Sequence, residues 1–297
     1  MRNNFSKAVL FLGIIGFLII AGIIFLQMSP TESFNAEEMT TKEHPLSAQV
    51  KTRLMESEGG ELLLQTIEAH GGLDAWHHAE TSSYLIGSTG GVQSKMVANN
   101  RTRQVYHDIR SMGADAPSSG AQMVWDGTNA WVYPDTLRVN SRFMATTWYY
   151  FHSIPFILAD PGVRYEILPN EVLEDVEYRL LRATFDDGVG DAPGDHYTLY
   201  IHPETHLVDA LRYRSTYGSG RPPINDEMTE TLLDYMDYVT VDGLTVATKF
   251  QGFGFSEGLR GDQYYEVMAS EISYRIPFDP SRLTMPSDAR IDPGPPE

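Results

Sequence analysis

The stretch TETLLDYMDYVTVDGLTVATKFQGFGF, residues 229–255, determines the fold class of this chain. Two long runs lie on either side of Asp242-Gly243, a pair that favours the tight turn of a β-hairpin. In the second run Leu244, Val246 and Phe250 alternate with smaller or more polar residues. This period of two predicts antiparallel strands that have one buried face and one solvated face.

The same period recurs along most of the chain after Thr81, with turn residues at short intervals. We predict strands at 81–87, 91–99, 102–109, 121–125, 130–134, 163–168, 177–186, 196–202, 207–217, 229–241, 244–255 and 263–275. The sequence therefore predicts a mainly β domain, built as a meander of many antiparallel strands.

A helical segment precedes the strands, because apolar residues between 47 and 69 recur at helical spacing. We expect Gly59-Gly60 to interrupt this helix and Gly71-Gly72 to end it, since glycine is common just past a helix C-terminus. Residues 73–78 are predicted to add one further turn of helix.

The block RFMATTWYYFHSIPFIL, residues 142–158, is the main interruption of the strand pattern. It is too long and too aromatic for a strand at this place, so we predict one helix or two short helices lying against the sheet. Two interpretations remain open. The segment either plugs the core of a curved sheet, or it lines or gates a ligand cavity.

The N-terminal region contains 19 consecutive residues, 8–26, without a charged or strongly polar side chain. As a helix they would measure about 28 Å, close to the hydrocarbon core of a bilayer. Arg2 and Lys7 precede the run and acids follow it, which predicts a cytoplasmic N-terminus and an exported body. We favour an uncleaved anchor over a cleaved signal peptide, whose apolar region is shorter.

The chain accordingly divides into four expected parts. Residues 1–28 form the transmembrane anchor, 29–46 a flexible linker, 47–288 the β domain, and 289–297 a disordered tail. The linker assignment rests on an acidic, aperiodic composition.

Composition excludes several classes of function. There is no cysteine, so a disulfide scaffold, a thiolate metal site and a cysteine nucleophile are excluded. The formal net charge of −18 repels polyanions, which argues against nucleic acid as a partner. The sequence contains no P-loop and no GxSxG nucleophile elbow, and no pair among its 40 acids stands out for acid–base catalysis.

Two polar patterns suggest metal binding only weakly, and we predict no metal and no cofactor. Carboxylates cluster in one loop, where calcium could find oxygen ligands, although Asp and Gly are also common in turns. The weak calcium candidates are Asp186, Asp187, Asp191 and Asp195. His202 and His206 flank Pro203-Glu204, which predicts a surface turn rather than a helical zinc motif.

Five segments together resemble an uncharacterised family of exported bacterial proteins. They are EAHGG (68–72) with Trp76, WDGTNAWVY (125–133), YYFHSIPFILADPG (149–162), GVGDAPGDHYTLYIHPETHLV (188–208) and VDGLTVATKF (241–250). That family in turn resembles periplasmic lipoprotein carriers and lipoprotein-sorting proteins of the Lol type, over roughly residues 62–288. The resemblance implies a half-open, unclosed β-barrel of about eleven strands, with helices filling its mouth and a cavity for acyl chains. No motif here locates the carriers' functional arginine.

From the residues and this resemblance we expect noncatalytic binding of a lipid, an acylated protein or another hydrophobic ligand, with a role in lipid or lipoprotein trafficking. The domain would lie outside the cytoplasm, held to the bacterial inner membrane by one span. The candidates for the cavity or its lid are aromatic: Trp125, Trp131, Phe143, Trp148, Tyr149, Phe151, Phe156 and Phe250. The alternatives are an interaction module of a cell-envelope complex and, less favoured, a hydrolase of unidentified residues.

Overall fold

The computed structural model describes residues 43–88, 91–112, 120–187, 189, 194–214, 230–256 and 258–293. The expected span 8–26 and most of the expected linker lie outside these residues. Within the described part of the chain, no helix combines the length and the apolar character needed to cross a bilayer. The chain divides into two compact units, 1–43 and 44–297, and all the hydrophobic core clusters described below lie in the second. The second unit therefore has the core that it needs to fold by itself.

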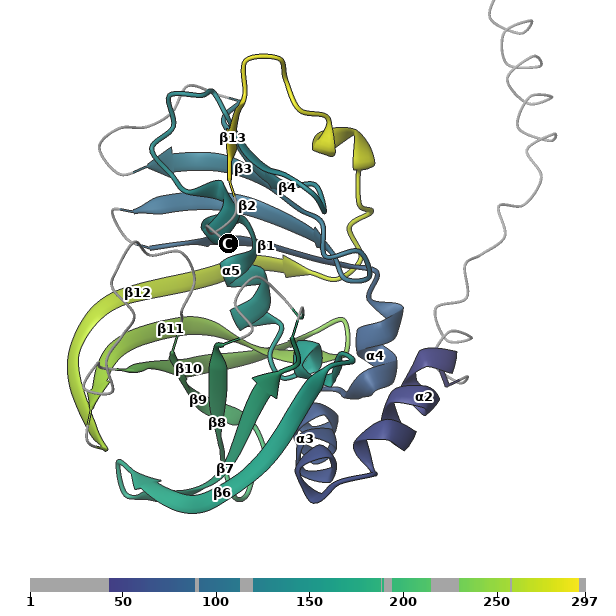
Figure 1. Ribbon diagram of the computed structural model, residues 1–297, viewed down its shortest axis with the longest axis vertical. Coiled ribbons are helices and arrows are strands. Elements are labelled where there is room, and N and C mark those ends of the chain that lie inside the picture. Colours follow the sequence, from purple (N-terminus) through teal and green to yellow (C-terminus); the bar gives the residue numbers. More distant parts are fainter. Residues whose placement is uncertain are drawn as a thin grey trace, which may run out of the picture. The chain divides into compact units, whose positions relative to one another are not determined.

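One antiparallel sheet contains all thirteen strands formed by the described residues (Figure 1). Its order is β13-β5-β4-β3-β2-β1-β12-β11-β10-β9-β8-β7-β6, so the two edges are β13 and β6. The strands are β1 (81–87), β2 (92–99), β3 (105–112), β4 (122–125), β5 (130–133), β6 (163–173), β7 (176–185), β8 (196–201), β9 (208–214), β10 (230–241), β11 (244–256), β12 (259–273) and β13 (290–292). The sheet is curved and unclosed, which confirms the predicted mainly β class, with thirteen strands in place of about eleven.

The β10–β11 hairpin shows why the sequence pattern was decisive. Thr240 pairs with Thr245 and Val241 with Leu244, so the loop consists of Asp242 and Gly243 alone. Both loop residues have positive φ, 53° and 89°, which a two-residue hairpin turn of the primed type requires. The Asp242 carboxylate also accepts a hydrogen bond from the Tyr274 amide at 3.0 Å, which ties the turn to the end of β12.

The helical segment before the sheet forms α2 (45–54), α3 (58–69) and α4 (72–78). The predicted interruption at Gly59-Gly60 is wrong, because the break lies at residues 55–57 and both glycines are inside α3. Ser57 caps α3 by accepting a hydrogen bond from the Gly60 amide at 3.1 Å. Glycine is needed at position 60 because a Cβ there would lie 2.1 Å from the Leu54 carbonyl oxygen. The predicted end at Gly71-Gly72 is confirmed, with φ values of 113° and 88°.

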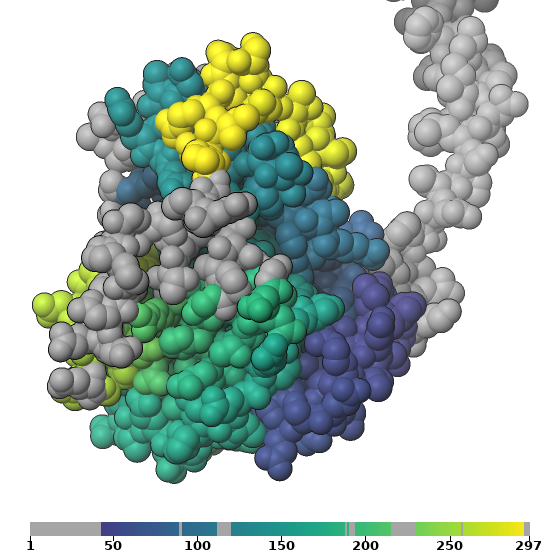
Figure 2. Space-filling view, in the orientation of Figure 1, coloured from purple at the N-terminus to yellow at the C-terminus, as the bar shows by residue number. Residues whose placement is uncertain are grey.

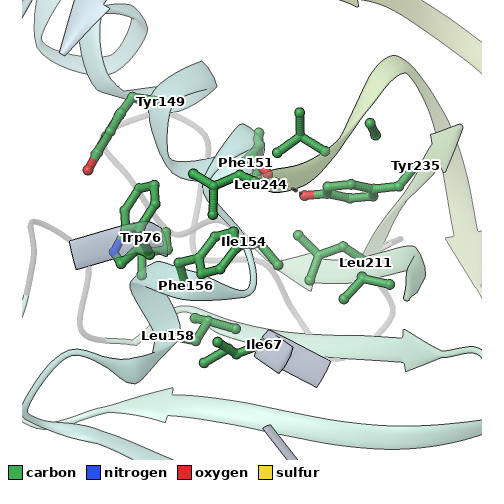
Figure 3. Close-up of a cluster of buried hydrophobic side chains, with 14 of the residues drawn as sticks. Ile67, Trp76, Tyr149, Phe151, Ile154, Phe156, Leu158, Leu211, Tyr235 and Leu244 are labelled. Carbon is green, nitrogen blue, oxygen red and sulfur yellow. Dashed lines mark hydrogen bonds between the residues drawn. The ribbon is translucent and has the colours of Figure 1, made fainter. Parts of the chain in front are cut away.

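The aromatic block forms two helices, as the sequence predicts. They are α5 (141–152) and the 3₁₀ helix η2 (156–159). Together with α3 and α4 they cover one face of the sheet and form the main hydrophobic core, part of which is drawn in Figure 3. There Phe156 stacks on Trp76 with 4.9 Å between ring centroids, and Tyr235 donates a hydrogen bond to the Phe151 carbonyl at 2.9 Å.

The C-terminal segment packs against the other face of β2–β5. Phe278, Leu283 and Ala289 contact a small core that contains Tyr106 and Trp131. In Figure 2 this yellow segment lies against teal residues of the central part of the chain. It includes the 3₁₀ helix η3 (280–283) and β13, which pairs with β5. The region expected as a tail, 289–297, thus contributes an edge strand.

Candidate ligand-binding cavity

A cavity of about 410 Å³ lies between α5, η2 and the curved sheet. This volume falls within the range of about 300–1,000 Å³ that is usual for small-molecule sites. The described residues that line it are Thr102, Arg103, Trp125, Gly127, Arg142, Phe143, Thr146, Thr147, Tyr150, Phe151, Ile157, Leu158, Asp160, Val163, Phe185, Val189, Asp195, Tyr197 and Tyr213.

Helix α5 has one face buried against the sheet and another that lines the cavity. Ser141, Ala145 and Tyr149 are fully buried against the sheet. The cavity-facing residues are Phe143, Thr146, Thr147 and Tyr150, whose spacing of three, one and three places them on one stripe of the helix. The same helix therefore fills the core on one side and walls a cavity on the other.

The buried face of α5 is held by a histidine from β3. His107 donates a hydrogen bond from Nε2 to the Ala145 carbonyl at 2.9 Å, and its Nδ1 accepts one from the Ser94 hydroxyl at 2.9 Å. Burial lowers the pKa of His107 to about 4, so the ring is neutral at pH 7, as this donor–acceptor arrangement requires.

Arg103 connects three parts of the cavity rim. It follows the β2–β3 turn with φ of 61°, and its guanidinium donates to the Tyr149 hydroxyl and to the Asp160 carboxylate, the latter at 2.6 Å. Burial raises the pKa of Tyr149, and the nearby Arg103 opposes that rise. The Arg103 guanidinium therefore links the β2–β3 turn to α5 and to the end of η2.

A second cation, Arg142, lies at the start of α5. Its guanidinium stacks on the Trp125 ring, 3.7 Å from the ring centroid, which is a close cation–π contact. The contact fixes the orientation of the indole that forms this part of the wall.

Helix η2 is anchored by two side chains that are absent from the described cavity lining. The Tyr165 hydroxyl donates to the Leu158 carbonyl at 2.5 Å, and the Arg53 guanidinium donates to the carbonyls of Ala159 and Asp160. These bonds satisfy the free carbonyls at the C-terminal end of the helix. The floor of the cavity is thus held in place by α2 and β6.

The structure divides the aromatic candidates into three groups. Trp125, Phe143 and Phe151 line the cavity. Trp148 lies one layer behind, where its ring contacts Phe151, Phe250 and Tyr265 at centroid distances of 5.8, 5.7 and 6.1 Å. The remaining candidates are buried in the cores and are absent from the described lining: Tyr149, Phe156 and Phe250 in the main core, and Trp131 on the other face of the sheet.

Sequence reasoning missed the polar part of the cavity and its β wall. Arg103 and Asp160 are 57 positions apart, and nothing in the sequence connects them before the fold is known. Phe185, Tyr197 and Tyr213 come from three successive strands, where an aromatic residue is equally suited to a core. Only α5 offered a usable signal for the cavity wall in its sequence, because Thr146 and Thr147 share one face of the helix with Phe143 and Tyr150.

The weak calcium candidates do not form a site in the described part of the chain. Asp186 is ion-paired with Arg164, Asp195 lines the cavity, and Asp191 lies outside the described residues. No group of three potential metal ligands converges among the residues that the structure describes. His202 and His206 bracket the β8–β9 turn, as predicted, and His202 Nδ1 accepts hydrogen bonds from the amides of Glu204 and Thr205.

Comparison with known proteins gives one family match and several similar structures. Residues 135–248 match a family model described as "Family of unknown function (DUF6503)". No curated protein matches the chain.

Three solved structures illustrate the likeness. A LolA superfamily protein from Nitrosomonas europaea is 11% identical with a TM-score of 0.45, covering 76% of this chain and 97% of that one. A DUF1329 family protein from Desulfovibrio piger is 12% identical with a TM-score of 0.47, and the match covers 76% of this chain and 95% of that one. An outer membrane lipoprotein-sorting protein domain from Vibrio parahaemolyticus is 9% identical with a TM-score of 0.46, and the match covers 75% of this chain and 94% of that one. The resemblance to Lol-like proteins expected from the sequence is confirmed, and the argument about function rests on the cavity.

Proposed function

We propose that this domain binds a lipid, an acylated protein or another hydrophobic ligand in the cavity beneath α5, without catalysing a reaction. The observation that carries the proposal is the cavity itself, about 410 Å³ and walled by aromatic and aliphatic side chains from α5, η2 and five strands. A concave space of this size, mostly apolar and with a few polar side chains in its wall, has the usual form of a small-molecule site.

The energetics of an acyl chain are compatible with this proposal. Burying one methylene group is worth about 0.8 kcal/mol, so ten of them give about 8 kcal/mol before entropic costs. That free energy corresponds to a dissociation constant of about 1 μM. A chain that leaves a bilayer gives up a similar apolar environment, so net transfer requires the cavity to match the membrane closely.

The proposed location follows from the N-terminal run 8–26. As a single span with a basic cytoplasmic flank, it would hold the domain at the outer surface of the cytoplasmic membrane, at a high local concentration near lipid. A tethered domain of this kind suits the local uptake or presentation of a ligand, within lipid or lipoprotein trafficking.

The test uses the unit 44–297, which contains the described core, purified and checked for cooperative thermal unfolding. Bound molecules are extracted and identified by mass spectrometry, and binding of the neutral probe N-phenyl-1-naphthylamine is measured by fluorescence. We expect a co-purified hydrophobic ligand and saturable probe binding. Phe151→Ala should weaken probe binding, because Phe151 lines the cavity.

The matched control is Phe278→Ala, which removes the same side chain from the opposite face of the sheet, where Phe278 packs on Tyr106. Its probe binding should equal that of the unmodified protein. A folded protein that retains no ligand and binds no probe would contradict the proposal and would favour an interaction module, in which the aromatic helix serves only as core.

A further inference from the structure

We propose that helix α2 is a strap that acid releases: protonation of the histidines at its start detaches α2 and thereby loosens η2, the floor of the cavity. The release of α2 stands by itself, whereas its effect on a ligand rests on the proposed function. Two observations carry the inference. Three histidine rings cluster where α2 begins, and an arginine near the end of α2 holds η2.

Helix α2 is attached mainly by polar contacts. It lies beside α3 and α4 (Figure 1), and only two of its ten residues, Ser47 and Leu54, are buried. The Ser47 hydroxyl is hydrogen-bonded to Nδ1 of His77 on α4 at 2.8 Å. Just before α2, the His44 amide donates to the Asp74 carboxylate at 2.9 Å. Because the helix buries little apolar surface, these polar contacts decide whether it stays docked.

Three histidines meet at the start of α2. The His44 ring lies 5.4 Å from the His77 ring and 5.1 Å from the His78 ring, measured between centroids. His44 also caps α2, since its Nδ1 accepts a hydrogen bond from the Leu46 amide at 3.2 Å. An imidazole nitrogen accepts a hydrogen bond only while it carries no proton. A proton added to His44 occupies this nitrogen, so protonation removes the cap of α2.

One carboxylate faces the histidines from α4. Burial acts against ionisation of Asp74, but hydrogen bonds from the Ser47 hydroxyl and the His44 amide lower its pKa, so it stays charged at pH 5. The other charged groups around the cluster are Glu43 next to His44, Lys51 of α2 with its partner Glu68 of α3, and Arg101 and Arg103 at the β2–β3 turn, the latter paired with Asp160. Positive charge added to the histidines is thus attracted by Asp74 and repelled by both arginines.

The docked state resists protonation of these rings. Burial first, and then the charge of His44, lowers the pKa of His77 to about 4. Burial first, and then the charge of His78, lowers the pKa of His44. When α2 detaches, the rings return to water, where a histidine titrates near pH 6.5. Since the detached state takes up protons first, docking of α2 weakens as the pH falls from about 6.5 towards 4.

Detachment of α2 reaches the cavity through Arg53. This residue lies in the last turn of α2, and its guanidinium donates to the carbonyls of Ala159 and Asp160, the latter at 3.3 Å. Ile157 and Leu158 of the same helix η2 line the cavity. When α2 leaves, the carbonyls at the end of η2 lose this donor. The cavity floor is then held less firmly, and we expect a ligand to dissociate faster.

The test uses residues 29–297, which contain the whole of unit 44–297 and keep the peptide bond before His44. Hydrogen exchange with mass spectrometry gives the protection factors of α2 and α3 at pH 7 and pH 5, corrected for the intrinsic pH dependence of exchange. We expect protection of α2 to fall about 5- to 20-fold more than that of α3, which reports global opening. Dissociation of bound N-phenyl-1-naphthylamine should be faster at pH 5 than at pH 7.

A double variant, His44→Asn with His77→Asn, removes both titrations and keeps hydrogen-bonding groups in place, because asparagine is a good N-cap and its amide replaces Nδ1. The fall in α2 protection relative to α3 should shrink to less than about twofold. His196→Gln is the matched control, since it replaces a half-buried histidine of β8 whose Nε2 bonds to Glu230. Its α2 protection should fall with pH as in the unmodified protein. Arg53→Gln should speed probe dissociation at pH 7, without acid.

Three outcomes would overturn parts of the inference. If α2 protection falls no more than that of α3, or falls equally in the double variant, the histidines do not release α2. Acid release of α2 without faster probe dissociation, together with unchanged dissociation in Arg53→Gln, would overturn the link to the cavity. A folded, unmodified protein that binds no probe at either pH would reject the proposed function, while the exchange of α2 would still test the strap.

Discussion

His152 lies at the end of α5 with its ring stacked on Tyr84, at 4.0 Å between centroids. Its Nε2 has no hydrogen-bond partner in the described part of the chain, and burial lowers its pKa to about 3. In the unfolded chain a histidine titrates near pH 6.5. Because the unfolded state takes up this proton first, the free energy of unfolding falls as the pH drops from about 6.5 towards 3.

His152→Phe should reduce this pH dependence, because phenylalanine keeps the ring stack and removes the titration. Between pH 7 and pH 5 the free energy of unfolding of the unmodified protein should fall about 2 kcal/mol more than that of the variant, as measured by urea denaturation. The other buried groups titrate equally in both proteins. They include His70 and His107, whose pKa values are lowered to about 4. Asp234, with its pKa raised to about 6, makes the free energy of unfolding rise rather than fall as the pH drops. Parallel pH profiles would contradict the assignment.

At the level of elements, local chemistry predicted most of the structure. Asp242-Gly243 predicted its hairpin correctly, because a two-residue turn requires positive φ at both positions and the Asp-Gly pair adopts these angles readily. Gly59-Gly60 predicted a helix break in the wrong place, because glycine usually destabilises a helix, whereas the close approach of Leu54 makes glycine necessary at position 60. Strand β13 has only three residues, too few to show a period, and its pairing with β5 depends on the packing of the C-terminal segment.

The α2–α3 junction gives a direct test of that explanation. Gly60→Ala should lower the free energy of unfolding by about 1–3 kcal/mol, since the new Cβ would lie 2.1 Å from the Leu54 carbonyl oxygen. The same change would stabilise an unconstrained helix. Glu61→Ala is the control, at the next and exposed position of α3. Thermal melts of the two variants compare them, and a stabilised Gly60→Ala would refute the close-contact explanation.

The start of α5 depends on the C-terminal strand. The Asp292 carboxylate accepts hydrogen bonds from the Ser141 amide at 2.7 Å and the Ser141 hydroxyl at 2.8 Å. Asp292→Ala should therefore cost about 0.5–2 kcal/mol and speed amide hydrogen exchange in the first turn of α5. Asp279→Ala removes the cap of η3 instead. It should leave exchange in α5 unchanged, and equal protection of α5 in both variants would exclude a role for β13.

For the whole molecule, the site was harder to predict than the fold. The cavity forms where the β2–β3 turn, α5, η2 and strands β7–β9 converge, and its position depends on how strongly the sheet curves. Curvature is a collective property that leaves no local mark in the sequence. An aromatic residue such as Phe151 or Phe250 has the same pattern whether it lines a void or fills a core, so the pattern identified the region and could not separate the lining from the packing behind it.

A change that fills the cavity should separate stability from binding. Val163 lines the void at the start of β6, and Val163→Phe would place a ring inside it. We expect the free energy of unfolding to rise by about 0.5–2 kcal/mol and the affinity for N-phenyl-1-naphthylamine to fall, because the ring occupies space that the ligand needs. Val124→Phe is the matched control in the packed core on the other face, where Val124 is fully buried. Overpacking there should cost about 1–3 kcal/mol without changing the affinity. If Val163→Phe were destabilising to the same degree, the space beneath α5 would not be open to a guest, and the cavity would lose its place as the functional centre of the molecule.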